Sequence, residues 1–448
     1  MKRLLTIALT MLAAAVGGAQ ELTLDSCLAL ARRNNPALQQ ARLEVERAAE
    51  VRRQARTAFF PQLSAQAAAF DSYKPLLRYG IDDVSDADLR QALNELYDRF
   101  GDRAGIEREL TLIENGAAAS VSAVQPLFAG GRIVAGNRLA EVAEEAAALQ
   151  AEVAGRELEW QVEQAYWLCV SLEMKQGVVA QMQQLLDTLK STVATAVASG
   201  VATEVDRLRL QLKCDEVDAQ SLRLDNGLAL ARRALAAAMG VDYSDGMVLA
   251  EKASEAPLPL LDEAADSLLA ARPEVQLLEL GVEAERLRAR MALAEALPQV
   301  VVGAGWGWSR LMLWDDHEHT GGNGMVWGGV QLPISGWWQA SHKVKEHRIA
   351  MQQAQLQRDD KSRQMALQQR QARTAVAEAE ATLRQSKRSV EQAQRVLNLA
   401  MLGYRTGMQT ISEVLEAQTL YAEALGRQND ALVERISAWH RYRALTAR

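Results

Sequence analysis

The chain of 448 residues contains an internal duplication, and this feature constrains its fold more than any other. Leu24-Asp25 returns as Leu261-Asp262, at an offset of 237 residues (261 − 24). Pro36 and Pro61 return at the same offset, as Pro273 and Pro298. Later landmarks recur at a shorter offset of 207 (407 − 200), and they pair Gly200, Asp206 and Gln211 with Gly407, Glu413 and Gln418. The two halves must therefore fold alike, with an insertion of about 30 residues in the first half.

The duplication predicts a first repeat at 20–240, a linker at 241–260 and a second repeat at 261–448. Apolar residues recur with helical period through most of each repeat. The expected helices are 24–59, 132–198 and 202–239 in the first repeat, and 261–297, 338–405 and 408–446 in the second. At 1.5 Å per residue the longest helices reach roughly 100 Å, far beyond an ordinary globular helix. Glycine turns at Gly200 and Gly407 fold each long helix back on its neighbour as an antiparallel hairpin.

Four other segments alternate with the period of a strand. In the clearest one, Val300, Val302, Ala304, Trp306 and Trp308 share a face and are interleaved with Val301 and three glycines. The expected strands are 63–72, 117–128, 299–310 and 324–334. Each is about ten residues long, which is the length that a tilted strand needs to cross a bilayer.

The N-terminus reads as a secretory signal peptide over residues 1–19, with a basic start, a short apolar run and small residues at its end. The net charge of −7 and the absence of a basic block argue against nucleic-acid binding. Three cysteines (Cys27, Cys169 and Cys214) leave at least one unpaired, and we interpret them as small apolar residues. No phosphate-binding loop or catalytic triad stands out, so we expect no enzyme and no cofactor.

The strands and the long helices together imply a tunnel. Four membrane-length strands cannot satisfy their edge groups in lipid, and four strands are too few to close a barrel. The chain must therefore share a barrel with copies of itself, with the helices projecting from one membrane face.

At this point the sequence resembles the TolC-like outer-membrane efflux proteins over essentially the whole mature chain. The resemblance lies in Leu24-Asp25-Ser26-Cys27-Leu28-Ala29-Leu30 running to Asn34-Asn35-Pro36, in Gln125-Pro126-Leu127-Phe128-Ala129-Gly130-Gly131-Arg132, and in Val414-Leu415-Glu416-Ala417-Gln418. It implies a mixed, mainly α fold. In a homotrimer, four transmembrane strands per chain would form a shared β-barrel in the outer membrane of a Gram-negative bacterium, and the helical hairpins would form a periplasmic α-barrel. A periplasmic adaptor and an inner-membrane pump would complete the export path.

The resemblance also suggests a gate at the hairpin tips, Gly200 and Gly407. It puts Asp206 and Tyr404 at the positions of one tie between neighbouring helices, and Gln409 where the family carries an arginine. It puts Glu413 and Glu416 where the family carries carboxylates that line the constriction; the alternative is that they are solvated surface charges.

Further residues have weaker assignments. Tryptophans border the second pair of strands and suit the two membrane interfaces, although simple packing is the alternative. They are Trp306, Trp308, Trp327, Trp337 and Trp338. The insertion at 73–115 forms an external loop with a helix near 85–100 that Ser85 and Asp88 would cap, and it is either a lid or a shield for the barrel rim. His317-Glu318-His319 lacks a further ligand, and no metal site is expected.

The sequence thus predicts a passive exit duct of an efflux or type I secretion system. The alternative is an exported coiled-coil scaffold without a channel, which has no reason to carry matched membrane-length hairpins. The sequence leaves open the cargo, the pump and adaptor, the bonding of the cysteines and whether the entrance is open.

Overall fold

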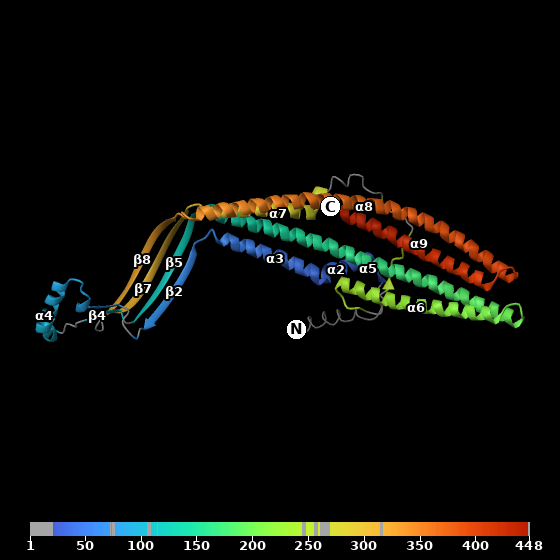
Figure 1. The fold of residues 1–448 in the computed structure, drawn as a ribbon, viewed down its shortest axis with the longest axis horizontal. Helices are drawn as coiled ribbons and strands as arrows, with labels where there is room; N and C mark the ends of the chain where they lie inside the picture. Colours follow the sequence, from blue (N-terminus) through green and yellow to red (C-terminus); the bar gives the residue numbers. More distant parts are fainter. Residues whose placement is uncertain are drawn as a thin grey trace, which may run out of the picture. The chain divides into compact units, whose positions relative to one another are not determined.

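A computed structural model describes residues 21–71, 73, 77–104, 109–113, 115–243, 248–254, 259, 269–313 and 317–446. The expected signal peptide at 1–19 and residues 261–268 of the second repeat lie outside the described residues. The chain divides into two compact units (Figure 1). The strand unit comprises Ala48–Ala143 and Val282–Gln353, and the helical unit comprises Met1–Arg47, Glu144–Gly281 and Ala354–Arg448.

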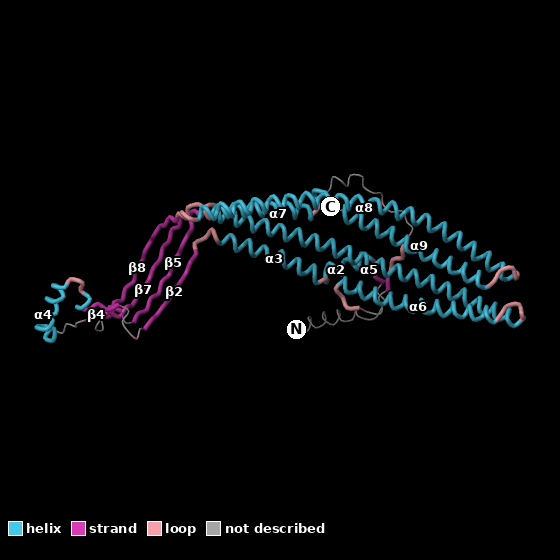
Figure 2. The backbone as a smooth tube through the Cα atoms, viewed as in Figure 1, coloured by secondary structure: helices cyan, strands magenta, loops and turns pink. Residues whose placement is uncertain are grey.

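The strand unit contains one four-stranded antiparallel sheet in the order β2-β5-β7-β8 (Figure 2). The strands are β2 (Gln62–Asp71), β5 (Asn115–Ala129), β7 (Gln299–Leu313) and β8 (His317–Gln331). The sequence placed the last strand at 324–334, whereas β8 begins seven residues earlier and ends before Pro333. Proline has no backbone N–H for a ladder bond, which disfavours continuing the regular pairing with β7.

The register gives the sheet two chemically different faces, because directly paired residues point to the same side. One face carries mostly alanine, valine, leucine and tryptophan, and we call it the apolar face. Its apolar members are Leu63, Ala65, Ala67, Ala69, Ala117, Ala119, Val121, Ala123, Val302, Ala304, Trp306, Trp308, Val326 and Val330, and Gln125, Arg310 and Thr320 lie on the same side. The opposite face, the polar face, carries Gln62, Ser64, Gln66, Ser120, Ser122, Ser309 and Asn323 together with Gly303, Gly305 and Gly307, and it also includes Ala68, Phe70, Ala118, Val124 and Met325.

Glycines on the polar face make room for an aromatic ring. Gly303 is the cross-strand partner of Trp327, and a Cβ at Gly303 would overlap the indole ring of Trp327. Trp327 is therefore on the face opposite to Trp306 and Trp308. On the apolar face Trp306 covers Gly322 in the same way, with 2.8 Å between its Cζ2 and the position of a glycine Cβ.

The helical unit consists of hairpins of long helices. The first hairpin joins α5 (Arg132–Ala198) to α6 (Glu204–Met239), and the second joins α8 (Gly336–Arg405) to α9 (Ile411–Thr446). Expected helix 24–59 is divided into α2 (Leu24–Asn34) and α3 (Pro36–Thr57), because Asn35 before the proline adopts an extended conformation. Expected helix 261–297 is represented by α7 (Pro273–Ala294), preceded at 269–271 by a short 3-10 turn.

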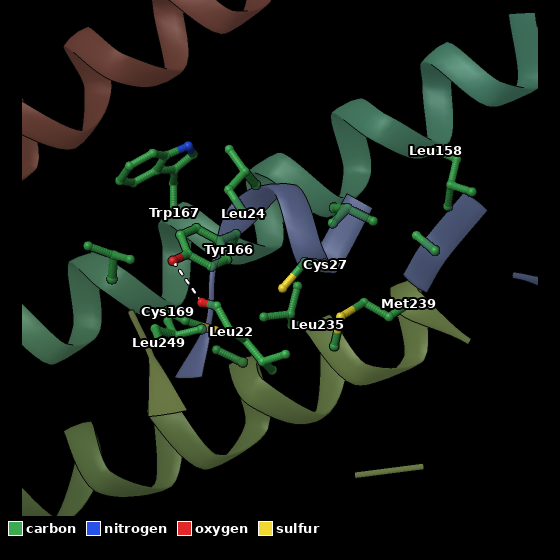
Figure 3. Packing of buried hydrophobic residues seen from close by; sticks show 14 of the residues in the cluster. Leu22, Leu24, Cys27, Leu158, Tyr166, Trp167, Cys169, Leu235, Met239 and Leu249 are labelled. Carbon is green, nitrogen blue, oxygen red and sulfur yellow. Dashed lines mark hydrogen bonds between the residues drawn. The ribbon is translucent and has the colours of Figure 1, made fainter. Parts of the chain in front are cut away.

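A buried cluster joins α2 to α5 and α6 (Figure 3). At its centre the Tyr166 hydroxyl donates to the Leu22 carbonyl at 3.2 Å and accepts from the Glu251 N–H at 3.2 Å. A two-residue parallel bridge between β1 (Glu21–Leu22) and β6 (Val248–Leu249) lies beside it, and no sequence pattern predicted this bridge. The three cysteines are free and buried, and burial raises the pKa of Cys27 to about 11 and that of Cys169 to about 12.

The insertion in the first repeat has more structure than the sequence indicated. It contains β3 (Leu77–Gly80) paired with β4 (Glu109–Ile113), the short helix η1 (Ile81–Asp83) and α4 (Ala87–Ala104). The predicted Ser85–Asp88 cap is wrong. Asp86 directly precedes the first helical residue, and its carboxylate accepts from the N–H groups of Asp88 at 3.0 Å and Leu89 at 3.1 Å.

We expect Gly303→Ala to destabilise the strand unit by about 1–3 kcal/mol, the usual cost of overpacking, because the new methyl group displaces the Trp327 ring. Thermal unfolding followed by the near-ultraviolet circular dichroism of tryptophan measures the change. Gly328→Ala is the control, since its nearest neighbour, the Val301 carbonyl, is 4.0 Å away. Combining Gly303→Ala with Trp327→Ala should remove the extra cost, and a purely additive double variant would contradict this contact.

Candidate functional site at the helix hairpin tips

Both hairpins turn with the same backbone geometry. Gly200 and Gly407 have φ values of 74° and 73°, in the left-handed region that favours glycine. In the first turn Val201 donates its N–H to the Ala196 carbonyl at 2.9 Å, and in the second Met408 donates to Gly403 at 2.8 Å. These are the bonds of a Schellman motif at equivalent positions of the two repeats, so the duplication extends to the tips.

Each returning helix begins with a capping box. Thr203 Oγ1 accepts from the Asp206 N–H at 3.3 Å, and the Thr203 N–H donates to Asp206 Oδ2 at 3.0 Å. Thr410 and Glu413 repeat the arrangement, with the Thr410 N–H 2.6 Å from Glu413 Oε2. The sequence analysis identified both carboxylates as gate residues but missed the threonines, although Thr-x-x-acid is a recognisable cap signature. Each carboxylate therefore caps its own helix, whether or not it also takes part in a gate.

A cavity of about 680 Å³ lies where the two tips meet. Asp206 and Tyr404 both line it, as do Gln409, three hydroxyl side chains of α5 (Ser191, Thr192 and Thr195) and Ser199 directly after that helix. The structure thus brings the two residues of the expected tie to one cavity from opposite hairpins.

Tyr404 and Asp206 are neighbours without a direct bond. The Tyr404 hydroxyl is buried and has no hydrogen-bond partner among the described residues. Burial, and secondarily the charge of Asp206, raises the pKa of Tyr404 above its ordinary value. The pKa of Asp206 is lowered, chiefly by the bonds it accepts from the Thr203 N–H and hydroxyl. A buried hydroxyl without a partner costs roughly 1–3 kcal/mol, so Tyr404 is poised to accept a new partner.

Gln409 stands where the resemblance implies an arginine, and its side chain packs against Gly403 of its own turn. A Cβ at Gly403 would be 2.7 Å from Gln409 Oε1, and that oxygen is buried with no partner in the described part of the chain. Its neutral amide cannot supply the ion pair that an arginine would make.

A cationic contact between the hairpins comes instead from α6. Arg209 Nη1 donates to Ser412 Oγ of α9 at 2.7 Å. Sequence reasoning missed this pair, since the partners are 203 residues apart and neither belongs to a motif. By contrast Arg207, two residues earlier, pairs within its own helix with Glu204.

An apolar cluster packs between the helices next to the hairpin tips. It includes Leu186 of α5, Leu210 of α6, and Ile411 and Val414 of α9, each 2% exposed or less. Glu413 and Glu416 lie exposed on the other side of α9. The cluster fixes where these carboxylates point, because Val414 and Ala417 anchor the same helix in the core.

The aromatic residues singled out from the sequence lie in different environments. Trp306 and Trp308 share the apolar face, whereas Trp327 lies on the polar face. Trp337 is exposed, and its indole N–H donates to the Ala296 carbonyl at 2.8 Å, joining two strand–helix turns. Trp338 is 77% exposed. The His317-Glu318-His319 side chains lie outside the described residues.

Comparison with known proteins gives a consistent result. The sequence model of the outer membrane efflux protein family matches residues 27–241 and 264–448. Among curated proteins no sequence matches the chain.

No helix in the described ranges is long and apolar enough to cross a bilayer.

Solved structures share the fold at low sequence identity. The outer membrane protein VceC from Vibrio cholerae is 19% identical, with 94% of this chain and 96% of that chain covered and a TM-score of 0.76. The transmembrane channel protein CusC is 15% identical, with 95% and 92% covered and a TM-score of 0.78. The MtrE outer membrane channel of Neisseria gonorrhoeae is 16% identical, with 94% and 88% covered and a TM-score of 0.73.

We expect the cap of α6 to weaken in acid. The lowered pKa of Asp206 means that its stabilisation is complete above the ordinary carboxyl pKa of about 4 and is lost as the pH falls through the lower folded value. Hydrogen exchange at the start of α6, corrected for the intrinsic rate, should show protection falling below about pH 4. Asp206→Asn should lack this change while Asp215→Asn, farther along α6, retains it. A wild-type profile that stays flat would contradict the assignment.

Proposed function

The chain belongs to the outer membrane efflux protein family, and on that premise we propose that three copies form one passive exit duct with its gate at the hairpin tips. It is an outer membrane efflux protein with a periplasmic helical extension. In the proposed trimer the three sheets join into a twelve-stranded barrel. An adaptor protein in the periplasm and a pump in the inner membrane deliver the cargo, so the pump and not this chain selects it.

The observation that carries the proposal is a membrane-length sheet with two unlike faces and two open edges. Within the described residues β2 and β8 each pair on one side only. Lipid offers no hydrogen bonds to the other side, so these edges need partners. With an even number of antiparallel strands, β8 of one copy and β2 of the next also run antiparallel, and the ring closes with regular pairing. The apolar face suits lipid, and the hydroxyls, amides and glycines of the polar face suit a water-filled lumen.

The same observation disfavours the coiled-coil scaffold. A scaffold in water gains nothing from exposing an apolar face of four strands, since exposed apolar patches of that size promote aggregation. Trp306 and Trp308 on the apolar face are in our proposal membrane-interface residues, with Trp337 and Trp338 near the opposite interface. Trp327 is left out of this belt, because its ring lies on Gly303 at the polar face.

The gate we propose has two parts within each chain. Asp206 and Tyr404 line the shared cavity from the two hairpins without a direct hydrogen bond, and Arg209 and Ser412 tie the same two hairpins a turn farther along. Arg209 compensates for Gln409, since it restores a cation to the junction. The contacts are few and partly exposed, so they are weak enough to be released when the adaptor binds.

Glu413 and Glu416 form the constriction in this proposal. Threefold symmetry would repeat these exposed carboxylates as rings of like charge around the entrance. Such rings favour cations over anions and hold multivalent cations most strongly.

Planar-bilayer conductance together with light scattering tests the function. We expect a trimer whose single-channel conductance is small and steady, because the entrance is nearly closed. A monomer that never inserts into the bilayer would overturn the duct and favour the scaffold.

The gate is tested by the same conductance measurement on variants. Tyr404→Phe, Asp206→Asn and Arg209→Ala should each raise the conductance, since each removes a polar group from the junction of the hairpins. Arg207→Ala is the matched control, because Arg207 forms its ion pair with Glu204 of its own turn. If no variant differs from Arg207→Ala, the gate does not lie at these residues.

The carboxylate rings are tested by cation block. Glu413→Gln and Glu416→Gln should each weaken block by trivalent cations several-fold, since the charge is lost at the narrowest point. Glutamine still fits a capping box, so Glu413→Gln keeps the start of α9 intact. Glu423→Gln, farther from the tip in a pair with Arg427, should leave the block unchanged. Undiminished block in both tip variants would place the constriction elsewhere.

A further inference from the structure

The helix α4 of the insertion has an apolar stripe that the described part of the chain leaves mostly exposed. Leu89, Leu96 and Phe100 are 52%, 59% and 54% exposed, and the half-buried Leu93 lies between them. The four residues are separated by four, three and four positions, which is the spacing of a heptad seam in a coiled coil. An ordinary surface helix of 18 residues does not expose its entire apolar seam to water.

The rest of α4 is built to stay helical and soluble. Asp86 caps its start, and Arg90 Nε donates to the Val84 carbonyl at 2.7 Å. Asp88, Glu95 and Asp98 lie on the side away from the stripe. Ala92 and Tyr97 border the centre of the seam, Arg90 and Arg99 flank its two ends, and Arg103 takes the next position beyond it, so a facing helix meets no charge between Leu93 and Leu96.

The insertion follows β2, an edge strand of the sheet. Strand β2, which ends at Asp71, leads into β3 at Leu77, and β4 ends at Ile113 just before β5 begins at Asn115. Strand β2 is the edge that pairs with the next copy in the proposed barrel. The insertion also contacts the sheet at β7, through β4. Each copy of the proposed trimer therefore carries its α4 at the strand ends away from the long helices.

We propose that the α4 helices of three copies pack their stripes together as a parallel three-helix coiled coil over the external mouth of the barrel. The inference rests on the proposed trimer, which supplies the three helices and makes them parallel by symmetry. An isolated helix of this length is marginal in water, but attachment to one barrel gives the three helices a high effective concentration. Burying three leucines and a phenylalanine in each copy then drives the packing.

The width of the stripe favours another copy over the lipid surface as its occupant. A helix that lies on lipid buries a broad apolar face and is rich in lysine and arginine on the other face. The stripe of α4 is the narrow seam of a coiled coil, and the side away from it carries acidic residues.

Disulfide cross-linking in the full-length protein tests the proposed coiled coil of α4 helices. Leu96→Cys in the seam should join copies covalently on mild oxidation, seen as dimers on a denaturing gel. The three natural cysteines are buried, so they give little background. Asp98→Cys, two residues away on the outer side of the same helix, is the matched control and should stay monomeric. Leu89→Cys, one heptad earlier in the seam, repeats the test if Leu96→Cys folds poorly.

The outcomes distinguish a failure of the coiled coil from a failure of the proposed duct. A trimeric mass with cross-links in the seam variants alone supports the coiled coil. A trimeric mass with no seam cross-links, or with equal cross-linking of Asp98→Cys, contradicts the coiled coil but not the exit duct. Protection of the Leu96→Cys thiol by lipid vesicles, without cross-links, would assign the stripe to the membrane surface instead. A protein that is not trimeric would contradict the proposed function itself.

Discussion

The backbone hydrogen bonds at the two edges of the four-stranded sheet are the constraint on which the rest of the molecule depends. In water an open edge can bond to solvent, but in the lipid that an apolar face of alanine, valine and tryptophan suits it cannot. In the proposed duct other copies of the chain therefore complete the sheet. Their helical hairpins then form a common wall, and the proposed gate and the proposed packing of the α4 helices both become properties of the assembly.

The duplication explains why the two hairpin tips match and also why their differences are informative. Both turns use a glycine at positive φ and a threonine–carboxylate cap, with the same bonds at equivalent positions. The repeats differ at the residues that could act between hairpins. Arg209 occupies the position equivalent to Glu416 (416 − 207), so one repeat carries a cation where the other carries a carboxylate. In the proposed duct, that asymmetry supplies one tie of the gate from the first repeat and one acidic ring of the entrance from the second.

Much of the architecture could be predicted from the sequence because its signals are local. The long helix that begins at Arg132 and the one that ends at Arg405 both run up to a glycine turn. The strands alternate apolar and polar or small residues with period two. The type and order of the elements therefore follow from neighbouring residues. The misses also have local causes. The strand β8 begins at His317 in a glycine-rich segment with no apolar alternation, and Asp86 rather than Ser85 caps α4 because helix start sites are uncertain by a residue or two.

The sequence by itself determined the family, the two repeats, the long hairpins and the membrane-length strands, since each depends on periodicity or on motifs a few residues long. Only the tertiary structure decided which face each strand residue occupies and which distant residues meet. Trp327 and Trp306 have similar sequence surroundings, but the register puts them on opposite faces, because a shift of one residue reverses the face. The Arg209–Ser412 bond and the cavity between Asp206 and Tyr404 join the two repeats. No local pattern encodes such contacts, because they arise from how two separately formed hairpins pack together.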